Sequence, residues 1–365
     1  GRSCAGCFRI PPRGKSGPDE HNPRRKGDPV PATPVTVVHH ADCQDGFGAA
    51  YAAWRRFGDD ATYRPMHHGQ PWELAEIAGH DVFILDFSFA PDVLEAIAAL
   101  AGSVVQIDHH ASARRPWSGR LMKAGDGRES FRHPALPLTV IFDLDKSGAR
   151  LAWEHFHPDR TVPLVLRHVE DVDLWRFALP GSRPIARALR LLPDDFAAWD
   201  ELVRQADTPD APRYLALLAE GEAIERSFQT EIARLAQGGL VMPARLRGEP
   251  VDPLQAQRHG LPTVSDGDRA WRPVDGLAVN ASALFASELG NRLAERSGTF
   301  GLVWELGADG DAKVSLRAAG RVDVAAIAAG YGGGGHPNAA GFRMPLARFA
   351  SEILGETLSQ TRLTM

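Results

Sequence analysis

The stretch 81–110, DVFILDFSFAPDVLEAIAALAGSVVQIDHH, contains the pattern that decides the fold. An apolar run from Asp81 to Asp86 is followed by a helical pattern from Pro91 to Leu100 and a second apolar run from Val104 to Ile107. Short apolar runs separated by a helix are typical of neighbouring parallel strands that are buried on both faces. The stretch therefore predicts a strand–helix–strand unit of an α/β domain.

The same alternation begins earlier, with a β-branched run from Val35 to Val38 and a helical pattern from Gly46 to Phe57. We therefore expect a parallel sheet with helices on both faces, which places its chemistry beyond the carboxyl ends of the strands. Each predicted strand ends in polar residues: His39 and His40, then Asp86, then Asp108, His109 and His110.

The chain of 365 residues is longer than one hydrophobic core usually organises, so we expect two domains. Residues 1–34 are rich in Gly, Pro, Arg and Lys and are predicted to be a disordered leader. Residues 35–240 form the predicted parallel-sheet domain. Residues 241–275 are polar and dense in Pro and Gly, which favours a linker. Residues 276–365 form a smaller α+β domain.

The composition limits the classes of partner. A formal charge of −5 argues against tight, non-specific binding of a long polyanion, so a phosphate-bearing substrate should be short. The three cysteines, Cys4, Cys7 and Cys43, do not suit a disulfide framework and favour a reducing, cytoplasmic location. We interpret Cys4 and Cys7 as incidental rather than as half of a zinc site. No run approaches the ~20 apolar residues of a membrane span, so no membrane role is expected.

Imidazoles and carboxylates occur in several segments of the predicted sheet domain. They are His40, Asp42 and Asp45; Asp86; Asp108, His109 and His110; and Asp171 and Asp173. This donor set suits Mn, Fe, Co or Zn rather than calcium. Two such ions about 3.5–4 Å apart can hold the attacking and leaving oxygens of a phosphoryl displacement. Asp45 could instead cap a helix, and either His39 or His40 should be structural because they point to opposite faces.

A second constellation is the stretch 330–341, GYGGGGHPNAAG. Consecutive glycines let backbone N–H groups approach an anion closely, and His336 and Asn338 add donors. The alternative is a flexible linker. Just upstream, Lys313, Ser315 and Arg317 share one face of a predicted strand. The planar guanidinium of Arg317 suits a phosphate, whereas Lys313 fits an exposed basic face better.

Two further hypotheses carry less weight. Cys43 near His40 could be a nucleophile with its base, but no orienting partner is evident. Trp54, Trp153 and Trp175 fit core packing better than base stacking.

Together these motifs resemble the DHH phosphoesterases that carry a C-terminal DHH-associated domain. The resemblance extends from Val35 to Pro345 and rests on Ile107-Asp-His-His110 and on the stretch 332–341, found in order with Asp86 ahead of them and a Ser147-Gly-Ala149 helix start between. It implies a metal-dependent phosphodiesterase, with two divalent ions, most often Mn²⁺, in the first domain and the substrate bound in the cleft between the domains.

The resemblance also implies roles for individual residues. The metal ligands would be His40, Asp45, Asp86, His109 and Asp173, with Asp86 bridging both ions. Asp108 and His110 would be the catalytic residues that orient ligands or contact the phosphate. The substrate-binding residues would be Arg317, Gly333, Gly334, Gly335, His336 and Asn338. One departure is Phe47, which stands where the family commonly has a further aspartate. Asp42 or a water would then complete the coordination of the second ion, or only one ion would bind.

The implied substrate is a short oligoribonucleotide, a cyclic or linear dinucleotide, or a nucleotide bisphosphate, hydrolysed by metal-activated water. Two alternatives remain open: a phosphatase acting on nucleotide bisphosphates or polyphosphate, and a non-catalytic nucleotide sensor. A homodimer is compatible with the sequence.

Overall fold

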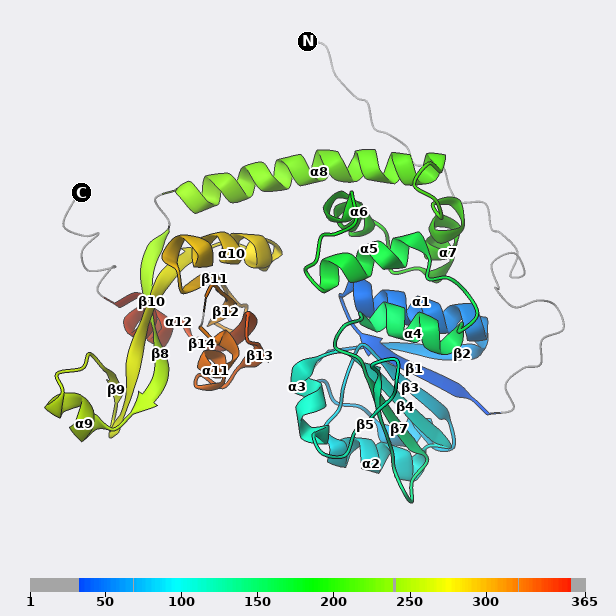
Figure 1. The fold of residues 1–365 in the computed structure, drawn as a ribbon, viewed down its shortest axis with the longest axis horizontal. Coiled ribbons are helices and arrows are strands. Elements are labelled where there is room, and N and C mark those ends of the chain that lie inside the picture. Colours follow the sequence, from blue (N-terminus) through cyan, green and yellow to red (C-terminus); the bar gives the residue numbers. More distant parts are fainter. Residues whose placement is uncertain (1–32, 68, 239–240, 321, 356–365) are drawn as a thin grey trace, which may run out of the picture. The chain divides into compact units, whose positions relative to one another are not determined.

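The computed structural model describes residues 33–67, 69–238, 241–320 and 322–355. The chain divides into two compact units, and the boundary between Glu222 and Ala223 falls within helix α8 (Pro212–Gln237). Figure 1 labels the elements of both units. The predicted disordered leader, including Cys4 and Cys7, lies outside the described residues except for its last two positions.

The first unit is built on a seven-stranded sheet in the order β2-β1-β3-β4-β7-β6-β5. The strands are β1 (Val35–His40), β2 (Ala61–Met66), β3 (Asp81–Leu85), β4 (Ser103–Asp108), β5 (Met122–Lys123), β6 (Glu129–Arg132) and β7 (Leu138–Phe142). Strands β2, β1, β3, β4 and β7 are parallel, while β6 and β5 extend the sheet in antiparallel pairing. The predicted parallel sheet is confirmed, and its antiparallel edge is an addition.

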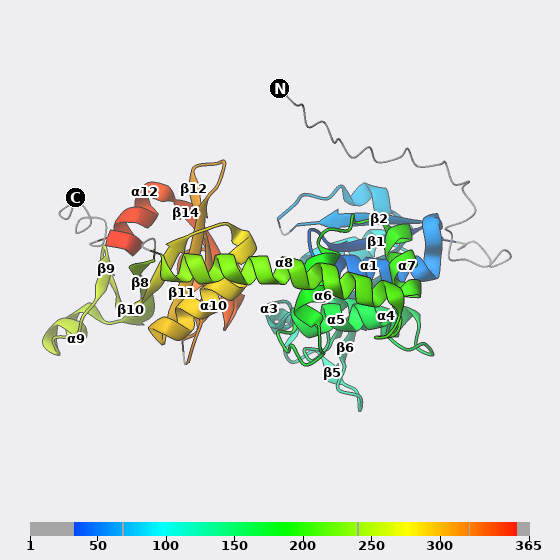
Figure 2. The same ribbon diagram turned by 90° about the horizontal axis from the view of Figure 1, so that it is seen from above.

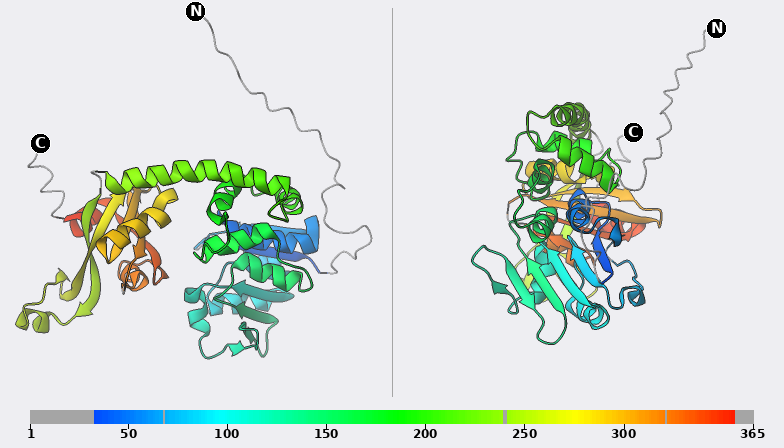
Figure 3. Two further views of the ribbon diagram at one scale, coloured as in Figure 1. Left: turned by 45° about the horizontal axis from the view of Figure 1, so that its top comes forward. Right: turned by 90° about the vertical axis from the view of Figure 1, so that its right-hand side faces the viewer.

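Helices cover both faces of this sheet, as predicted. They are α1 (Gln44–Phe57), α2 (Pro91–Leu100), α3 (Ala111–Arg114), α4 (Gly148–Phe156), α5 (Leu164–Asp173), α6 (Ser182–Leu189) and α7 (Phe196–Gln205). Helices α1 and α4 pack on one face and α2 on the other (Figures 1 and 3). The close approach of α1 to α4 requires Gly48, because a Cβ there would lie 2.9 Å from the Cβ of Ala149.

The second unit contains a sheet in the order β13-β14-β12-β11-β10-β8, with β9 paired to β10. The strands are β8 (Met242–Val251), β9 (Val264–Asp266), β10 (Arg269–Asn280), β11 (Phe300–Leu306), β12 (Asp311–Ala318), β13 (Gly334–His336) and β14 (Ala339–Pro345). The helices are α9 (Pro253–Arg258), α10 (Ala286–Ser297), α11 (Val324–Ala329) and α12 (Leu346–Phe349). Helix α10 packs on one face and α12 on the other (Figure 2). Helix α11 shares the hydrophobic cluster of α12. The predicted smaller α+β domain is thus present.

The stretch 241–275 differs from its prediction as a linker. It contains β8, β9 and part of β10, and β8 pairs antiparallel with β10 along most of its length. Three of the five prolines that suggested a linker lie in strands: Pro243 and Pro250 in β8 and Pro273 in β10. Strand β8 lies at the edge of the sheet, where a missing N–H is tolerated, and Pro273 adjoins a register shift. The prolines in these strands therefore lie at a sheet edge and beside a bulge rather than in a linker.

No helix in the described part of the chain is both long enough and apolar enough to cross a membrane.

Candidate metal centre

Neighbouring parallel strands bring the predicted metal ligands to one edge of the first sheet. Strands β1, β3 and β4 lie side by side, and His40, Asp86 and His109 stand at or just after their carboxyl ends. Two helices supply the other members: Asp45 lies in the first turn of α1, and Asp173 is the last residue of α5. We call these five residues the metal-site cluster.

The distances within the metal-site cluster are short. The Nε2 atom of His109 lies 3.2 Å from Asp86 Oδ1, 3.6 Å from Asp173 Oδ2 and 3.7 Å from Asp45 Oδ2. On the other side, Nδ1 of His40 lies 3.7 Å from Asp86 Oδ2. The structure therefore brings together all five predicted ligands, with Asp86 between the two histidines.

The buried atoms of the cluster fit a divalent cation. Asp86 is only 2 % exposed, yet neither of its carboxylate oxygens has a hydrogen bond of good geometry, and Nε2 of His109 also lacks one. A buried, unsatisfied carboxylate is costly unless a cation or donors compensate its charge. The remaining donors are imidazole and carboxylate, which bind divalent ions such as Mn²⁺ and Zn²⁺. These residues could therefore hold metal.

Asp45 links two helix starts to the cluster. Its carboxylate accepts hydrogen bonds from the backbone N–H groups of Gly148 (2.6 Å) and Ala149 (3.0 Å) at the start of α4. Asp45 is not the N-cap of α1, a position that Cys43 occupies. Two glycines permit this packing, because a Cβ at Gly148 would lie 2.4 Å from Asp86 Cβ and one at Gly46 would lie 2.3 Å from His40 O.

We predict that Gly148→Ala weakens metal binding at least about tenfold, because the added methyl group must displace Asp86. Gly125→Ala is the matched control, since a Cβ at that position meets no atom within 4 Å. Isothermal titration with a divalent ion measures both variants. Equal affinity in the two variants would show that the position of Asp86 does not limit metal binding.

The electrostatics of the metal-free cluster reflect its excess of carboxylates. Burial alone would lower the pKa of His109, but Asp86, Asp173 and Asp45 outweigh it and raise this pKa to about 10. Burial raises the pKa of Asp173 to about 6 against the opposing effect of His109, and it raises the pKa of Asp45 as well. Burial would also raise the pKa of Asp86, but the nearby imidazoles of His109 and His40 lower it overall.

We predict that metal binding releases protons at neutral pH and weakens as the pH falls. To bind a metal ion, an imidazole must be neutral and a carboxyl group must be ionised. With a pKa of about 10, His109 is protonated at pH 7 in the metal-free protein, so an ion must displace that proton. Calorimetric titrations in buffers of different ionisation enthalpy count the protons released. A binding enthalpy that is the same in every buffer would contradict the prediction.

Asp108 and His110 form a hydrogen-bonded pair beside the cluster, and each has a possible ligand atom within 4.8 Å of Asp86 and His109. Asp108 is 1 % exposed, and its Oδ1 lies 2.6 Å from His110 Nδ1 and accepts the backbone N–H of His109 at 2.7 Å. Its Oδ2 accepts the hydroxyl of Ser88. The buried carboxylate thus fixes the orientation of the half-buried His110 ring, which lines a cavity of about 270 Å³ together with Asp86 and Ser88.

Three candidate residues lie outside the cluster. The side chain of Asp42 is 85 % exposed and its Oδ2 lies 3.5 Å from His67 Nε2, so it is in none of the described groups of possible metal ligands. Asp171 is buried and accepts from the backbone N–H groups of Ala178 and Leu179, which makes it a structural cap. His39 packs edge-on against Phe47, and burial lowers its pKa to about 4.

Cys43 lies closer to the cluster than the sequence indicated. Its sulfur, a ring nitrogen of His40 and a carboxylate oxygen of Asp86 all lie within 4.8 Å of one another. Burial, followed by the charges of Asp86 and Asp45, raises the pKa of the thiol in the metal-free protein. A free thiolate nucleophile is therefore disfavoured.

Trp175 is a candidate substrate contact that sequence reasoning missed. It was expected in the core, as Trp54 and Trp153 are, but it is 44 % exposed and lies two residues after Asp173. Trp175 and Phe177 have positive φ angles of 56° and 50°, which are rare for bulky residues and often mark functional sites. The guanidinium of Arg183 lies 3.5 Å from the Phe177 ring centroid and 5.5 Å from that of Trp175. The only sequence signal for a role of Trp175 was its position two residues after the predicted ligand Asp173.

Arg317 has the properties of an anion-binding residue in the second unit. Its guanidinium donates to the carbonyl of Leu316 (2.8 Å) and the hydroxyl of Ser287 (2.7 Å), and it forms no ion pair with any carboxylate of the described residues. Burial lowers its pKa. Its aliphatic stem packs on Gly290 of α10, where a Cβ would lie 2.8 Å from Arg317 Cγ. Two hydrogen bonds thus hold the side chain in place, and no carboxylate in the described part of the chain is paired with it.

The glycine-rich stretch is more ordered than the predicted loop. Gly334, Gly335 and His336 form β13, which pairs with β14, and Asn338 lies in the exposed turn between them. Gly333 and Gly335 allow β14 to approach, because a Cβ at these positions would lie 2.1 Å from Gly341 O and 2.5 Å from Ala339 O. A Cβ at Gly334 would meet no atom within 4 Å, so its surface remains open to a ligand.

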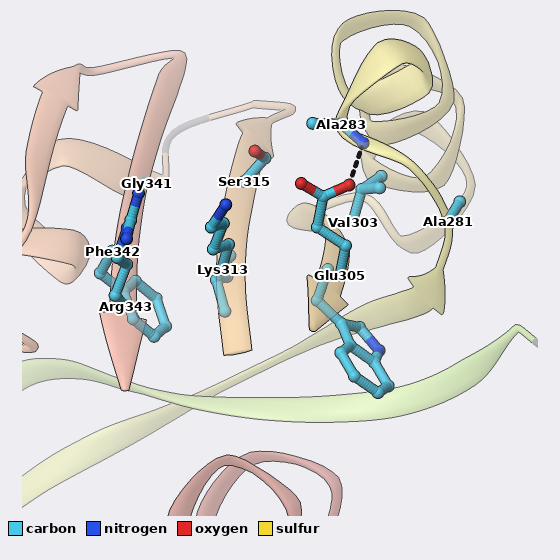
Figure 4. A pocket seen from close by; sticks show the side chains of 11 residues that line it. Ala281, Ala283, Val303, Glu305, Lys313, Ser315, Gly341, Phe342 and Arg343 are labelled. Carbon is cyan, nitrogen blue, oxygen red and sulfur yellow. Dashed lines mark hydrogen bonds between the residues drawn. The ribbon is translucent and has the colours of Figure 1, made fainter. Parts of the chain in front are cut away.

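A groove of about 340 Å³ lies on the face of the second unit's sheet that carries Lys313 and Ser315 (Figure 4). Lys313, Ser315 and Gly341 line it on β12 and β14, with Glu305 and Arg343 on either side. Glu305 accepts the backbone N–H of Ala283, and Lys313 makes no ion pair within the described residues. Lys313 is therefore half-buried in a groove rather than on the fully exposed face that the sequence favoured.

The second unit matches a known family model. The model of the DHHA1 domain matches residues 277–361. We call this matched segment the DHHA1 domain. The segment begins inside β10, so β8 and β9 precede it. The resemblance that rested on the glycine-rich stretch is confirmed for this part of the chain.

Comparison with individual proteins gives more distant similarity. An uncharacterized protein, R106, of Acanthamoeba polyphaga mimivirus is 27 % identical over 324 residues, covering 84 % of this chain and 66 % of that protein. The chain thus spans about two thirds of the length of this relative. Among solved structures, the pGpG-specific phosphodiesterase PggH of Vibrio cholerae is 13 % identical with a TM-score of 0.41, covering 91 % of this chain and 98 % of that one. RecJ of Thermus thermophilus, solved with Mn²⁺, is 17 % identical with a TM-score of 0.41, covering 88 % and 51 %.

Proposed function

We propose that this chain is a metal-dependent phosphodiesterase that hydrolyses short oligoribonucleotides or cyclic or linear dinucleotides with metal-activated water. The observation that carries the proposal is the metal-site cluster, in which the buried carboxylate of Asp86 has two oxygens without hydrogen bonds between two imidazoles. The DHHA1 domain supports a phosphoester substrate through Arg317, whose guanidinium has no carboxylate partner among the described residues.

We assign the residues to two ligand sets that share Asp86. His40 lies in one group of possible ligands with Asp86, and Asp45, His109 and Asp173 form another. Asp86 connects the two groups, because its Oδ1 lies 3.2 Å from His109 Nε2. When bound, two divalent ions, Mn²⁺ in this proposal, would lower the pKa of water and neutralise charge on the phosphate. Asp86 would keep both sets together, while the partly exposed side chains of His40 and Asp173 leave them accessible to water.

The other residues orient and bind. Asp108 holds the His110 ring at 2.6 Å, so that its second nitrogen can donate a proton toward a phosphate or leaving-group oxygen. In the DHHA1 domain, Arg317, Gly333, Gly334, Gly335, His336 and Asn338 would bind the remaining phosphate and sugar groups. Arg317 has N–H donors beyond the two that contact Leu316 and Ser287.

We expect Asp86→Asn to abolish turnover and the binding of both ions, because an amide cannot bridge two cations. Asparagine is the suitable replacement, since Asp86 has a φ of 50°, a conformation that Asn and Asp tolerate. The metal-free variant should unfold at the same or a higher temperature, because a buried carboxylate without partners is removed. Metal content, turnover of a dinucleotide and the melting temperature with and without Mn²⁺ test this. Wild-type turnover in this variant would refute the proposed function.

A phosphatase that removes terminal phosphates is the second candidate. It is favoured by two cations of the DHHA1 domain, Lys313 and Arg317, which lie on one face of β12 and form no ion pair within the described residues. The exposed ring of Trp175 favours a nucleotide instead, since an aromatic side chain can stack on a base and polyphosphate has none. Trp175 therefore distinguishes the two substrate classes.

We predict that Trp175→Ala raises KM for a dinucleotide about tenfold, the loss of one base-stacking contact of ~1–3 kcal/mol. Hydrolysis of tripolyphosphate should be unaffected, and Trp175→Phe should retain most of the dinucleotide affinity. Trp271→Ala is the matched control, because Trp271 also lies under an arginine, with Arg247 4.7 Å from its ring. An equal effect on both substrates would assign Trp175 a structural role and favour the phosphatase.

A further inference from the structure

The family resemblance implies an aspartate ligand at position 47, where this chain has Phe47. Asp42 does not replace that ligand. Phe47 itself is 5 % exposed and belongs to the core, stacking on Phe196 at 4.9 Å and meeting the edge of Trp199 at 5.0 Å. Asp42 is turned toward His67 at the surface. The ligand set of His40 and Asp86 therefore lacks one protein ligand, and neither Phe47 nor Asp42 supplies it.

Cys43 is placed to complete that set. Its sulfur, the His40 ring nitrogen and an Asp86 oxygen lie within 4.8 Å of one another. Metal–ligand bonds of about 2.0–2.3 Å allow ligand atoms up to roughly 4.5 Å apart, so a small adjustment of these side chains suffices. Asp86 is 98 % buried and its oxygens have no hydrogen bonds, which independently indicates that a cation belongs at this point.

We propose that Cys43 is a metal ligand, so that one ion is held by the Cys43 thiolate, His40 and the bridging Asp86. The other ion is held by Asp45, His109, Asp173 and the same Asp86. This inference rests on the proposed metal centre and goes beyond it in naming a thiolate ligand. On binding, the sulfur–metal bond replaces the S–H bond, and the thiol proton leaves to solvent.

The simpler roles for Cys43 do not account for its position. It is the N-cap of α1, but its side chain makes no capping hydrogen bond. It is not a core residue either, because it is half-buried and lines two cavities of about 410 and 240 Å³. The N-terminus of a 14-residue helix carries a partial positive charge, which favours a thiolate there once cations offset the neighbouring carboxylates.

A thiolate ligand changes the expected metal preference. Sulfur is a softer donor than a carboxylate, so the Cys43 position should prefer Zn²⁺, Co²⁺ or Fe²⁺ to Mn²⁺. The set of Asp45, His109 and Asp173 has only oxygen and nitrogen donors and remains suited to Mn²⁺. With Cys43 as a ligand, the two positions differ in metal preference, so Mn²⁺ would bind at the Cys43 position more weakly than at the other.

Cobalt binding tests this inference in a chain with a single thiol. The chain has three cysteines, so Cys4→Ser with Cys7→Ser leaves Cys43 as the only one. We expect this parent to bind two Co²⁺ per chain, to show a thiolate-to-cobalt charge-transfer band, and to react more slowly with iodoacetamide when Co²⁺ is present. Adding Cys43→Ser, which keeps an N-cap hydroxyl, should remove the band and reduce the count to one. Adding Cys43→Asp instead should remove the band but keep two ions.

The outcomes separate this inference from the proposed function. If the parent binds two Co²⁺ without a charge-transfer band and its thiol is not protected, Cys43 is not a ligand, while the metal centre stands. If the parent binds no Co²⁺, the metal centre fails and the inference fails with it. Circular dichroism of each Cys43 variant shows whether the chain is folded. A folded Cys43→Ser variant that keeps both ions and the band would also overturn the inference.

Discussion

The mutual repulsion of three carboxylates, those of Asp45, Asp86 and Asp173, is the constraint on which the first unit depends. They surround His109 Nε2 within 3.7 Å, and neither carboxylate oxygen of Asp86 has a hydrogen bond of good geometry to offset its burial. Gathering such charges is unfavourable, so the scaffold must hold them there. Adjacent parallel strands fix Asp86 and His109, and the amides of α4 fix Asp45. The repulsion lowers the stability of the metal-free protein, and cation binding restores that stability.

The positions at the strand ends could be predicted from the sequence because they follow from the geometry of a parallel sheet. Short apolar runs located β1, β3 and β4, and the residues that follow such runs must converge on one edge. The antiparallel edge of β5 and β6 could not be predicted, because these strands are short and partly exposed. Strand β8 was missed for a different reason: its prolines are tolerated only because it lies at a sheet edge.

The residues around the metal-site cluster were harder to predict, because local geometry decides which neighbour points inward. Asp42 and Cys43 are adjacent in sequence, but a positive φ of 53° at Asp42 leaves its carboxylate exposed, while Cys43 begins α1 beside His40. Asp171 and Asp173 also look equivalent in sequence. The first caps the turn after α5, and the second reaches His109. The residue types in the sequence predicted imidazole and carboxylate ligands, but the backbone conformation determines which of the neighbouring residues point into the cluster.

The two units have opposite electrostatic deficits. In the first, buried carboxylates outnumber the cations that could balance them, and this deficit raises the pKa of His109 to about 10. In the DHHA1 domain, the guanidinium of Arg317 and the ammonium of Lys313 form no ion pair within the described residues. Divalent ions would remove the first deficit, and a phosphate group would remove the second. The proposed function supplies both kinds of ligand, whereas a phosphate-free ligand would offer no anion to Lys313 and Arg317.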